Sequence, residues 1–344
     1  MRGQVETALQ LTQQMLELAQ ASRDTALLLE ANYACGDTLF WAGDFERSLR
    51  YMEEALKLYD RAKHHSLAFV YGGYDPGVAS LAFSAWDLWM LGHPEQAVVR
   101  SDESLALANA LHQPFSQAIA LSFAAMLHYW RHDPAATRRY AEETVALCTE
   151  HGIAIYLEMG KIMLGWADNQ EKQGDEGIEL IRGAIADWRA SGAELVIPQL
   201  QQVLAATLAR GESYEAALAA IDEALGVISN TGDRSFEADC WRWKGELLWR
   251  SMGGNESGHP EAEACLHKAI AIARQQKAIS LELRAHTRLG PLLARKGEAE
   301  RAHQSLAEVH GKFQEGFDTH DLKHAKQVLD ELREHAEAAG KNTR

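Results

Sequence analysis

Small apolar and polar positions recur along the chain at a nearly constant interval within longer apolar stretches. The steps between them are 40, 49, 40, 40, 40, 45 and 40 residues. They join Ala8, Ser48, Ala97, Thr137, Gly177, Ala217, Ala262 and Ala302. A period of this size is typical of stacked helical repeats, in which each unit buries its apolar face against the next. The pattern therefore predicts an all-α solenoid.

Two further sets of small residues keep the same period. One set lies twelve residues before the positions named above, except that a longer loop separates Gly245 from Ala262. It comprises Gly36, Ala85, Ala125, Gly165, Ala205, Gly245 and Gly290. The other lies seven residues after the first and comprises Ala55, Ser104, Thr144, Ala184, Ala224 and Ala269. Small side chains at matched depths let two antiparallel helices, and then successive pairs, approach closely.

Six of the seven prolines stand where a helix is expected to begin, a position that tolerates the missing N–H of proline. Together with the turn residues they predict one continuous solenoid over 1–338. Its expected parts are a half-repeat at 1–22, helix pairs at about 24–63, 76–112, 114–151, 153–191, 196–230, 233–277 and 279–315, and a capping helix at 318–338. A disordered tail is expected at 339–344.

The repeat unit resembles the tetratricopeptide repeat. Trp241 with Gly245, the pair Leu289-Gly290, and Gly43-Asp44-Phe45 with Ala55 match positions of that pattern. The unit is about six residues longer than the roughly thirty-four residues usual for that repeat, so longer helices are expected. The resemblance implies a right-handed superhelix of about seven helix pairs.

Two segments narrow the resemblance. Tyr71–Val78 reads YGGYDPGV, and EGFDT at 315–319 leads through Ala325-Lys326 into the final helix. Both look like the C-terminal repeat region of bacterial signalling ATPases, often linked to adenylyl cyclase domains. They are also similar to the sensor arms of maltose-regulator-type (LuxR-like) activators. The resemblance implies an array that receives a ligand or partner for an attached switch.

The sequence lacks the switch modules of those signalling proteins. It contains no G-x-x-x-x-G-K-[ST] loop and no cyclase or DNA-binding segment. Because Met1 also stands almost directly before the second helix of a pair, we expect a fragment or a free-standing descendant of a longer switch protein.

Charge and composition limit the partners. The formal net charge is -15, which opposes nucleic acid and anionic membrane surfaces, since both attract Lys and Arg. The N-terminus lacks the uninterrupted apolar run of a signal peptide, and the most apolar stretch, Ser80–Leu91, is too short to span a bilayer. The four cysteines are far apart and lie in apolar stretches, which indicates buried reduced thiols. A cytoplasmic protein is expected.

No motif indicates catalysis or a cofactor. His128 with His132, and His320 with His324, have the spacing that puts two ligands on one helix face. Neither pair has a third ligand nearby in sequence, so no metal site is expected. No nucleophile with its base and no phosphate-binding loop is present either, and the chain is not expected to be an enzyme.

The expected binding surface is the concave face, lined by the first helix of each pair. By the register of the repeats it includes Tyr33, Phe40, Trp41, Trp86, Trp89, Tyr129, Trp130, Trp166, Arg210, Arg242, Trp249, Arg250, Arg284 and Arg295. Aromatic anchors in the N-terminal half and Arg forks in the C-terminal half suit a peptide or an acidic segment. The alternative is that the aromatic side chains form the core, since a register error of one residue turns them by roughly 100°.

The sequence thus predicts a non-catalytic regulatory scaffold that binds a peptide or partner domain, with an NTPase or cyclase module as a candidate partner. The alternative is a sensing arm for a small molecule such as a sugar or nucleotide, because aromatic faces also stack on such ligands.

Overall fold

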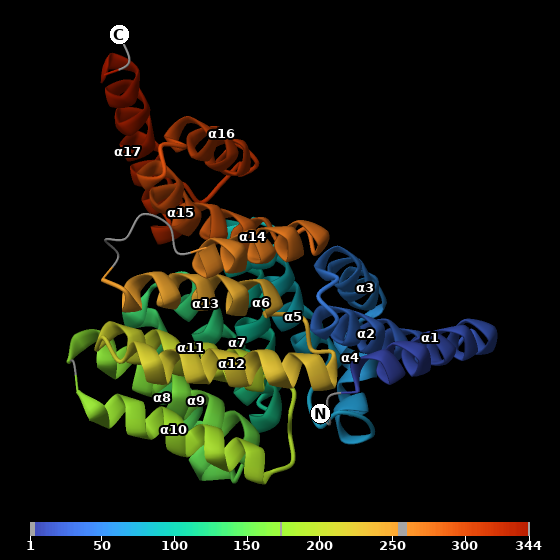
Figure 1. Cartoon of the computed structure of the whole chain (residues 1–344). Helices are drawn as coiled ribbons and strands as arrows, with labels where there is room; N and C mark the ends of the chain where they lie inside the picture. Colours follow the sequence, from blue (N-terminus) through green and yellow to red (C-terminus); the bar gives the residue numbers. More distant parts are fainter. Residues whose placement is uncertain (1–3, 173, 254–259, 343–344) are drawn as a thin grey trace.

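The chain is a solenoid of helices (Figure 1). The computed structural model describes residues 4–172, 174–253 and 260–342, and every regular element in this part of the chain is a helix. Seven helix pairs follow one another there: α2 (Thr25–Trp41) with α3 (Phe45–Leu58), α5 (Pro76–Met90) with α6 (Pro94–Leu111), α7 (Pro114–Trp130) with α8 (Pro134–His151), α9 (Ala154–Glu171) with α10 (Asp175–Ala190), α11 (Ile197–Arg210) with α12 (Tyr214–Thr231), α13 (Glu237–Ser251) with α14 (Pro260–Gln275), and α15 (Ile279–Arg295) with α16 (Ala299–His310). The predicted all-α, tetratricopeptide-like class is confirmed.

Single helices flank the pairs at both ends. Helix α1 (Val5–Ser22) precedes them, and α17 (His320–Asn342) follows them. A short helix α4 (Arg61–His64) and a 3-10 turn η1 (His65–Phe69) fill the longer connection before α5. Helix α17 extends to Asn342 and so includes positions 339–342, where the sequence predicts a tail; residues 1–3 and 343–344 lie outside the described part of the chain.

Local sequence explains where the helices begin and end. The Asp24 side chain accepts hydrogen bonds from the first free N–H groups of α2, and the Asp75 side chain does the same for α5. Proline occupies the first helical position of α5, α6, α7 and α8. Gly152 and Gly232 end α8 and α12 with φ of 68° and 75°, a left-handed conformation that glycine adopts without strain.

The small residues lie at the helix crossings, as the repeat pattern predicts. A Cβ added to Gly165 in α9 would lie 2.7 Å from the carbonyl oxygen of Gly177 in α10. A Cβ at Gly245 in α13 would lie 2.8 Å from the carbonyl oxygen of Ala262 in α14. Gly165 and Ala217 are both buried. The period therefore reflects close backbone contact within each pair.

Gly165→Ala should lower the free energy of unfolding by about 1–3 kcal/mol, because the new methyl group has no room against Gly177. Gly183→Ala is the matched control in α10, where an added Cβ meets nothing within 4 Å. That variant should gain roughly 0.5–1 kcal/mol from lower backbone entropy in the unfolded chain. Urea unfolding followed by circular dichroism measures both; shifts of the same sign would contradict the crossing argument.

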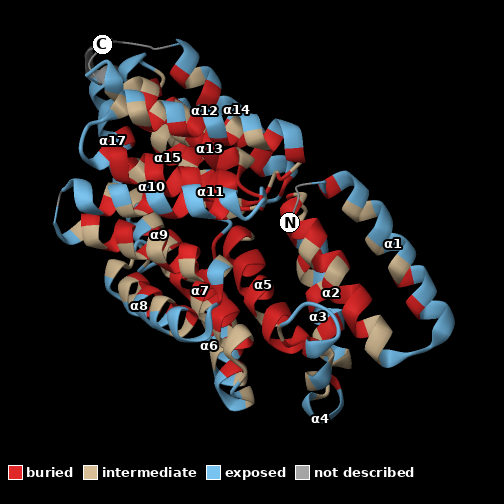
Figure 2. Cartoon of the chain, turned by 90° about the horizontal axis from the view of Figure 1, so that it is seen from below, coloured by how far each residue is buried: buried red, intermediate tan, exposed pale blue. Residues whose placement is uncertain are grey.

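The first helices of the pairs form an inner layer, and the second helices form an outer one. Fourteen of the 15 residues of α5 are buried. In Figure 2, α5 is almost entirely red, whereas α1 and α8 carry long pale-blue stretches. Consecutive first helices also contact one another, from α5 through α7, α9, α11 and α13 to α15. The core therefore runs along the inside of the solenoid.

The C-terminal pairs pack back onto the N-terminal ones. The Ser280 hydroxyl of α15 donates to the carbonyl oxygen of Trp89 in α5 at 2.5 Å. The backbone N–H of Arg234 donates to the carbonyl oxygen of Trp41 at 2.8 Å. In Figure 1 the orange helices α14 and α15 accordingly lie against the blue and teal ones. The inner face of the N-terminal half is thus covered by the chain itself.

The loop before α17 completes this closure. The Glu315 carboxylate accepts hydrogen bonds from the backbone N–H groups of Glu95 at 2.9 Å and Gln96 at 3.0 Å, at the start of α6. In return, the Gly316 N–H donates to the Glu95 carboxylate at 2.8 Å. An anion at a helix N-terminus is favoured by the unpaired N–H groups there. The EGFDT segment thus has a structural role in this fold.

Candidate functional site

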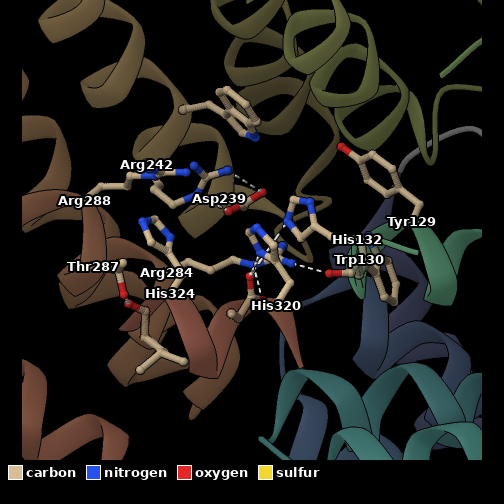
Figure 3. Close-up of a pocket in the computed structure, with 13 residues that line it drawn as sticks. Tyr129, Trp130, His132, Asp239, Arg242, Arg284, Thr287, Arg288, His320 and His324 are labelled. Carbon is tan, nitrogen blue, oxygen red and sulfur yellow. Dashed lines mark hydrogen bonds and ion pairs between the residues drawn. The ribbon is translucent and has the colours of Figure 1, made fainter. Parts of the chain in front are cut away.

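A partly open cavity lies where α7, α13, α15 and α17 meet (Figure 3). Its volume is about 80 Å³. Its lining combines arginines, acidic residues, histidines and aromatic rings: Tyr129, Trp130, His132, Asp239, Arg242, Trp243, Leu283, Arg284, Thr287, Arg288, His320, Asp321 and His324. We call it the arginine pocket. It brings side chains from both halves of the chain together.

Arg242 forms the buried floor of the arginine pocket. Its Nε donates to Asp239 Oδ1 at 2.6 Å, and its Nη1 donates to Glu246 Oε2 at 2.8 Å. All three residues lie on α13 at helical spacing and are buried. Burial alone would raise the pKa of the Asp239 carboxyl, but the charge and hydrogen bonds of Arg242 lower it by more. The pKa is therefore below its usual value, and the carboxyl is ionised at neutral pH. Arg288 of α15 places its Nε 3.0 Å from Glu246.

Arg284 connects three helices at one wall of the pocket. Its Nε donates to Asp321 Oδ2 in α17 at 2.7 Å, and its Nη2 donates to the carbonyl oxygen of Trp130. The guanidinium also lies over the Trp89 ring, 4.7 Å from the centroid. Burial raises the pKa of the Asp321 carboxyl, but Arg284 reverses the effect and holds this pKa well below its usual range.

Two histidines lie at the mouth of the pocket beside Asp321. His132 follows α7 and His320 begins α17, and their ring centroids are 4.2 Å apart. Figure 3 shows the two rings next to each other. The sequence predicted no third ligand for either histidine pair; the fold brings together members of the two pairs and adds Asp321. No spacing could reveal this group, because 188 residues separate His132 from His320.

The predicted binding residues separate into three groups. Tyr33, Phe40, Trp41, Trp86, Trp89, Trp130 and Trp166 are buried. The Trp86 ring, for example, stacks on Phe123 at 3.7 Å, and Trp130 contacts Phe236 at 5.4 Å. In this conformation these rings cannot contact a partner, apart from the edge of Trp130 in the pocket. These seven aromatic residues therefore lie in the core, which is the alternative interpretation of their positions in the sequence.

Tyr129, Arg242 and Arg284 form the second group, which lines the arginine pocket. Trp249 and the remaining arginines form the third group and lie outside the pocket. The Arg250 guanidinium lies over Tyr214 at 5.1 Å, the Arg295 guanidinium lies over Trp249 at 5.4 Å, and Arg210 donates to the carbonyl oxygen of Gln170 at 3.1 Å. These contacts hold the three arginine side chains against neighbouring side chains and backbone. Sequence reasoning missed Asp239, Arg288, Asp321 and Trp243, which carry no repeat signal.

The four cysteines are buried and unpaired, as the sequence predicts. Burial raises the pKa of Cys148 to about 11, so this thiol is neutral at physiological pH. None of the described helices combines the length and apolarity needed to cross a membrane.

Comparison with known proteins identifies the fold. No protein-family model and no curated protein matches the sequence. Among solved structures, a Rap protein complexed with competence and sporulation factor is 9% identical and covers 97% of this chain and 99% of its own, with a TM-score of 0.57. The apo form of RapI is 10% identical over 84% of this chain and 99% of its own, with a TM-score of 0.52. Aspartyl phosphate phosphatase F from Bacillus subtilis is 10% identical over 87% and 74%, with a TM-score of 0.50. The chain is thus a tetratricopeptide-like helical-repeat protein.

Proposed function

We propose that this protein is a non-catalytic regulatory scaffold that binds an acidic peptide or partner segment at the arginine pocket. The observation that carries the proposal is the convergence of Arg242, Arg284 and Arg288 on one polar cavity, in a chain of net charge -15. Arginine forks bind carboxylates through paired, charge-assisted hydrogen bonds. Elsewhere an acidic surface would repel such a segment, so a place where guanidinium groups gather is where it would bind.

Arg288 is the arginine best placed to meet a ligand. Its side chain is 36% exposed, and only its Nε takes part in the ion pair with Glu246. The guanidinium therefore has further N–H groups for an incoming carboxylate. Tyr129 and Trp243 flank the same cavity and offer apolar faces for the stem of an acidic side chain.

The size of the pocket favours a peptide over the sugar or nucleotide alternative. Pockets for small ligands usually measure about 300–1,000 Å³. The arginine pocket, at about 80 Å³, admits one carboxylate group, while the rest of a peptide would lie across its mouth. A sensing arm would need a wider hollow, such as the one of about 490 Å³ between the α2–α3 turn and the α14–α15 turn, lined by Gly43, Arg234 and Lys277.

The likeness to a Rap protein complexed with competence and sporulation factor supports a binding role for this fold. The resemblance of Tyr71–Val78 and of 315–326 to signalling ATPases supports the finer proposal of a sensor arm or fragment of a bacterial ATPase or cyclase. Neutral, buried thiols fit a binding protein in the reducing cytoplasm, where we place it.

A displayed library of random peptides, panned against the full chain, tests the proposal. Enriched peptides should carry Asp or Glu, and Arg288→Gln should weaken their binding by about tenfold or more, because a charge-assisted hydrogen bond is lost. Arg182→Gln is the matched control, since Arg182 lies on the outer helix α10 and is 47% exposed. It should leave affinity unchanged.

The same protein is screened with mono- and dinucleotides and with oligosaccharides by thermal shift. A saturable shift from one of these solutes would favour the sensing arm. Enriched peptides without acidic residues, or peptides that bind Arg288→Gln as tightly as the parent chain, would overturn the assignment to the arginine pocket.

A further inference from the structure

We propose that His132, His320 and Asp321 form a binding site for a divalent transition-metal ion such as Zn²⁺. Imidazole nitrogen and carboxylate oxygen are common ligands of zinc, and three protein ligands suffice when water or another group takes the fourth position. One ligand atom from each of these residues lies within 4.8 Å of the other two. The site would join the turn after α7 to the start of α17.

The spacing of the ligand atoms fits a tetrahedral ion. Metal–ligand bonds of about 2.0–2.1 Å place two tetrahedral ligands about 3.4 Å apart. Nδ1 of His320 lies 3.5 Å from Asp321 Oδ1, and Nε2 of His132 lies 3.8 Å from the same oxygen. These separations are at or beyond the limit of a hydrogen bond. Both separations are compatible with a shared ion, and the ligand atoms of His132 and His320 lie within 4.8 Å of each other.

The surroundings leave the facing oxygen of Asp321 available. Arg284 is bound to Oδ2, which fixes the orientation of the carboxylate and leaves Oδ1 toward the two rings. The charges of the pocket arginines are met locally, because Asp239 and Glu246 pair with Arg242, and Glu246 also pairs with Arg288. The histidine side chains are half exposed, so an ion can reach them from solvent.

His132 has φ of 55°, a left-handed conformation that is uncommon for a residue with a side chain. The corresponding position in the turns after α2, α5 and α15 is glycine: Gly43, Gly92 and Gly297, with φ of 79°, 87° and 82°, whereas in the turn after α11 it is Glu212, with φ of 59°. The conformation is thus a property of the turn, and it sets the direction of the His132 side chain. In this turn the side chain projects toward His320 (Figure 3).

A bound ion would hold the last helix against the central repeats beside the arginine pocket. The three ligands come from segments 188 residues apart, so binding would stabilise contact between the two halves of the chain. Water or another small ligand would complete the coordination.

Metal binding is measured on the full chain after treatment with a chelator and dialysis. Titration with Zn²⁺ in competition with a chromophoric chelator should give one equivalent with a Kd in the micromolar range or tighter, and Zn²⁺ should raise Tm. Co²⁺ in the same site should give the intense visible bands of a tetrahedral complex. His132→Gln and His320→Gln should each weaken binding by about tenfold or more.

His335→Gln is the matched control, because His335 is an exposed histidine on the same helix α17. It should retain full binding and the full Tm shift. Circular dichroism checks that every variant keeps its helical content, since substitution at the half-exposed His132 and His320 should not unfold the chain. Absence of stoichiometric binding by the parent chain would overturn the proposal. Binding that survives both His132→Gln and His320→Gln, or that falls equally in His335→Gln, would do the same.

Discussion

Arg242→Met should lower the free energy of unfolding by about 3–5 kcal/mol, because it leaves two carboxylates buried without their main counter-charge. Asp239 and Glu246 are each less than a tenth exposed and depend on Arg242 for hydrogen bonds at 2.6 and 2.8 Å. Methionine keeps much of the volume of the side chain, so the loss reports on charge rather than on a cavity. Urea unfolding at neutral pH, followed by circular dichroism, measures the change.

Arg182→Met supplies the comparison. Arg182 forms an ion pair with Glu179 of the same i,i+3 spacing as that of Arg242 with Asp239, but both partners are about half exposed or more. Exposed pairs of this kind contribute about 0–1 kcal/mol. Equal effects of the two substitutions would mean that water enters the arginine pocket and solvates its carboxylates.

Glu30→Gln should stabilise the protein at pH 8 by as much as about 3 kcal/mol and leave its stability nearly unchanged at pH 4. Glu30 lies on the buried face of α2. Burial, reinforced by the nearby charge of Asp75, raises the pKa of its carboxyl from 4.5 to about 7. A shift of one pKa unit corresponds to about 1.4 kcal/mol, so ionisation in the fold is costly.

The sign of the effect follows from proton linkage. Below pH 4.5 the carboxyl is protonated in both the folded and the unfolded chain, and it contributes no pH dependence. As the pH rises from 4.5 to about 7, the unfolded chain loses this proton first, which lowers the stability of the fold. Glutamine is neutral throughout and removes this slope.

Unfolding curves measured between pH 4 and pH 8 should therefore diverge for the parent chain and Glu30→Gln across that window. Glu17→Gln, on the exposed face of α1, should follow the parent within about 0.5 kcal/mol. Parallel curves for the parent and Glu30→Gln would show that the Glu30 carboxylate is solvated in the fold.

Local packing rules made the repeat predictable from the sequence. Two helices can cross as closely as α9 and α10 do at Gly165 and Gly177 only if the residues at the crossing are small. Because each helix pair has such a crossing, small residues recur in the sequence with the period of the repeat. The starts of helices were also predictable. Proline lacks the N–H that would stay unpaired in the first turn of a helix, and an aspartate before the helix accepts hydrogen bonds from such N–H groups. These signals act within one or two turns of the chain.

The candidate site depends on contacts of another kind. Arg284 meets Trp130 because the solenoid curves until its two halves touch, whereas its pair with Asp321 joins the neighbouring helices α15 and α17. Such a contact occurs once in the molecule and leaves no period. The same closure explains Trp89, which was predicted to line the concave face: residues of α15 cover it. Trp86 is buried for another reason, because its ring stacks on Phe123 of the next first helix.

The contacts between distant pairs also change how the array should respond to denaturation. In an open solenoid each repeat touches only its neighbours, and the ends can fray independently of the middle. Here Ser280 and Glu315 bind the helix pair that begins at Pro76, so melting the last repeats would uncover α5 at once. Loss of either end therefore removes support from the other, and the chain should unfold as one cooperative unit rather than repeat by repeat.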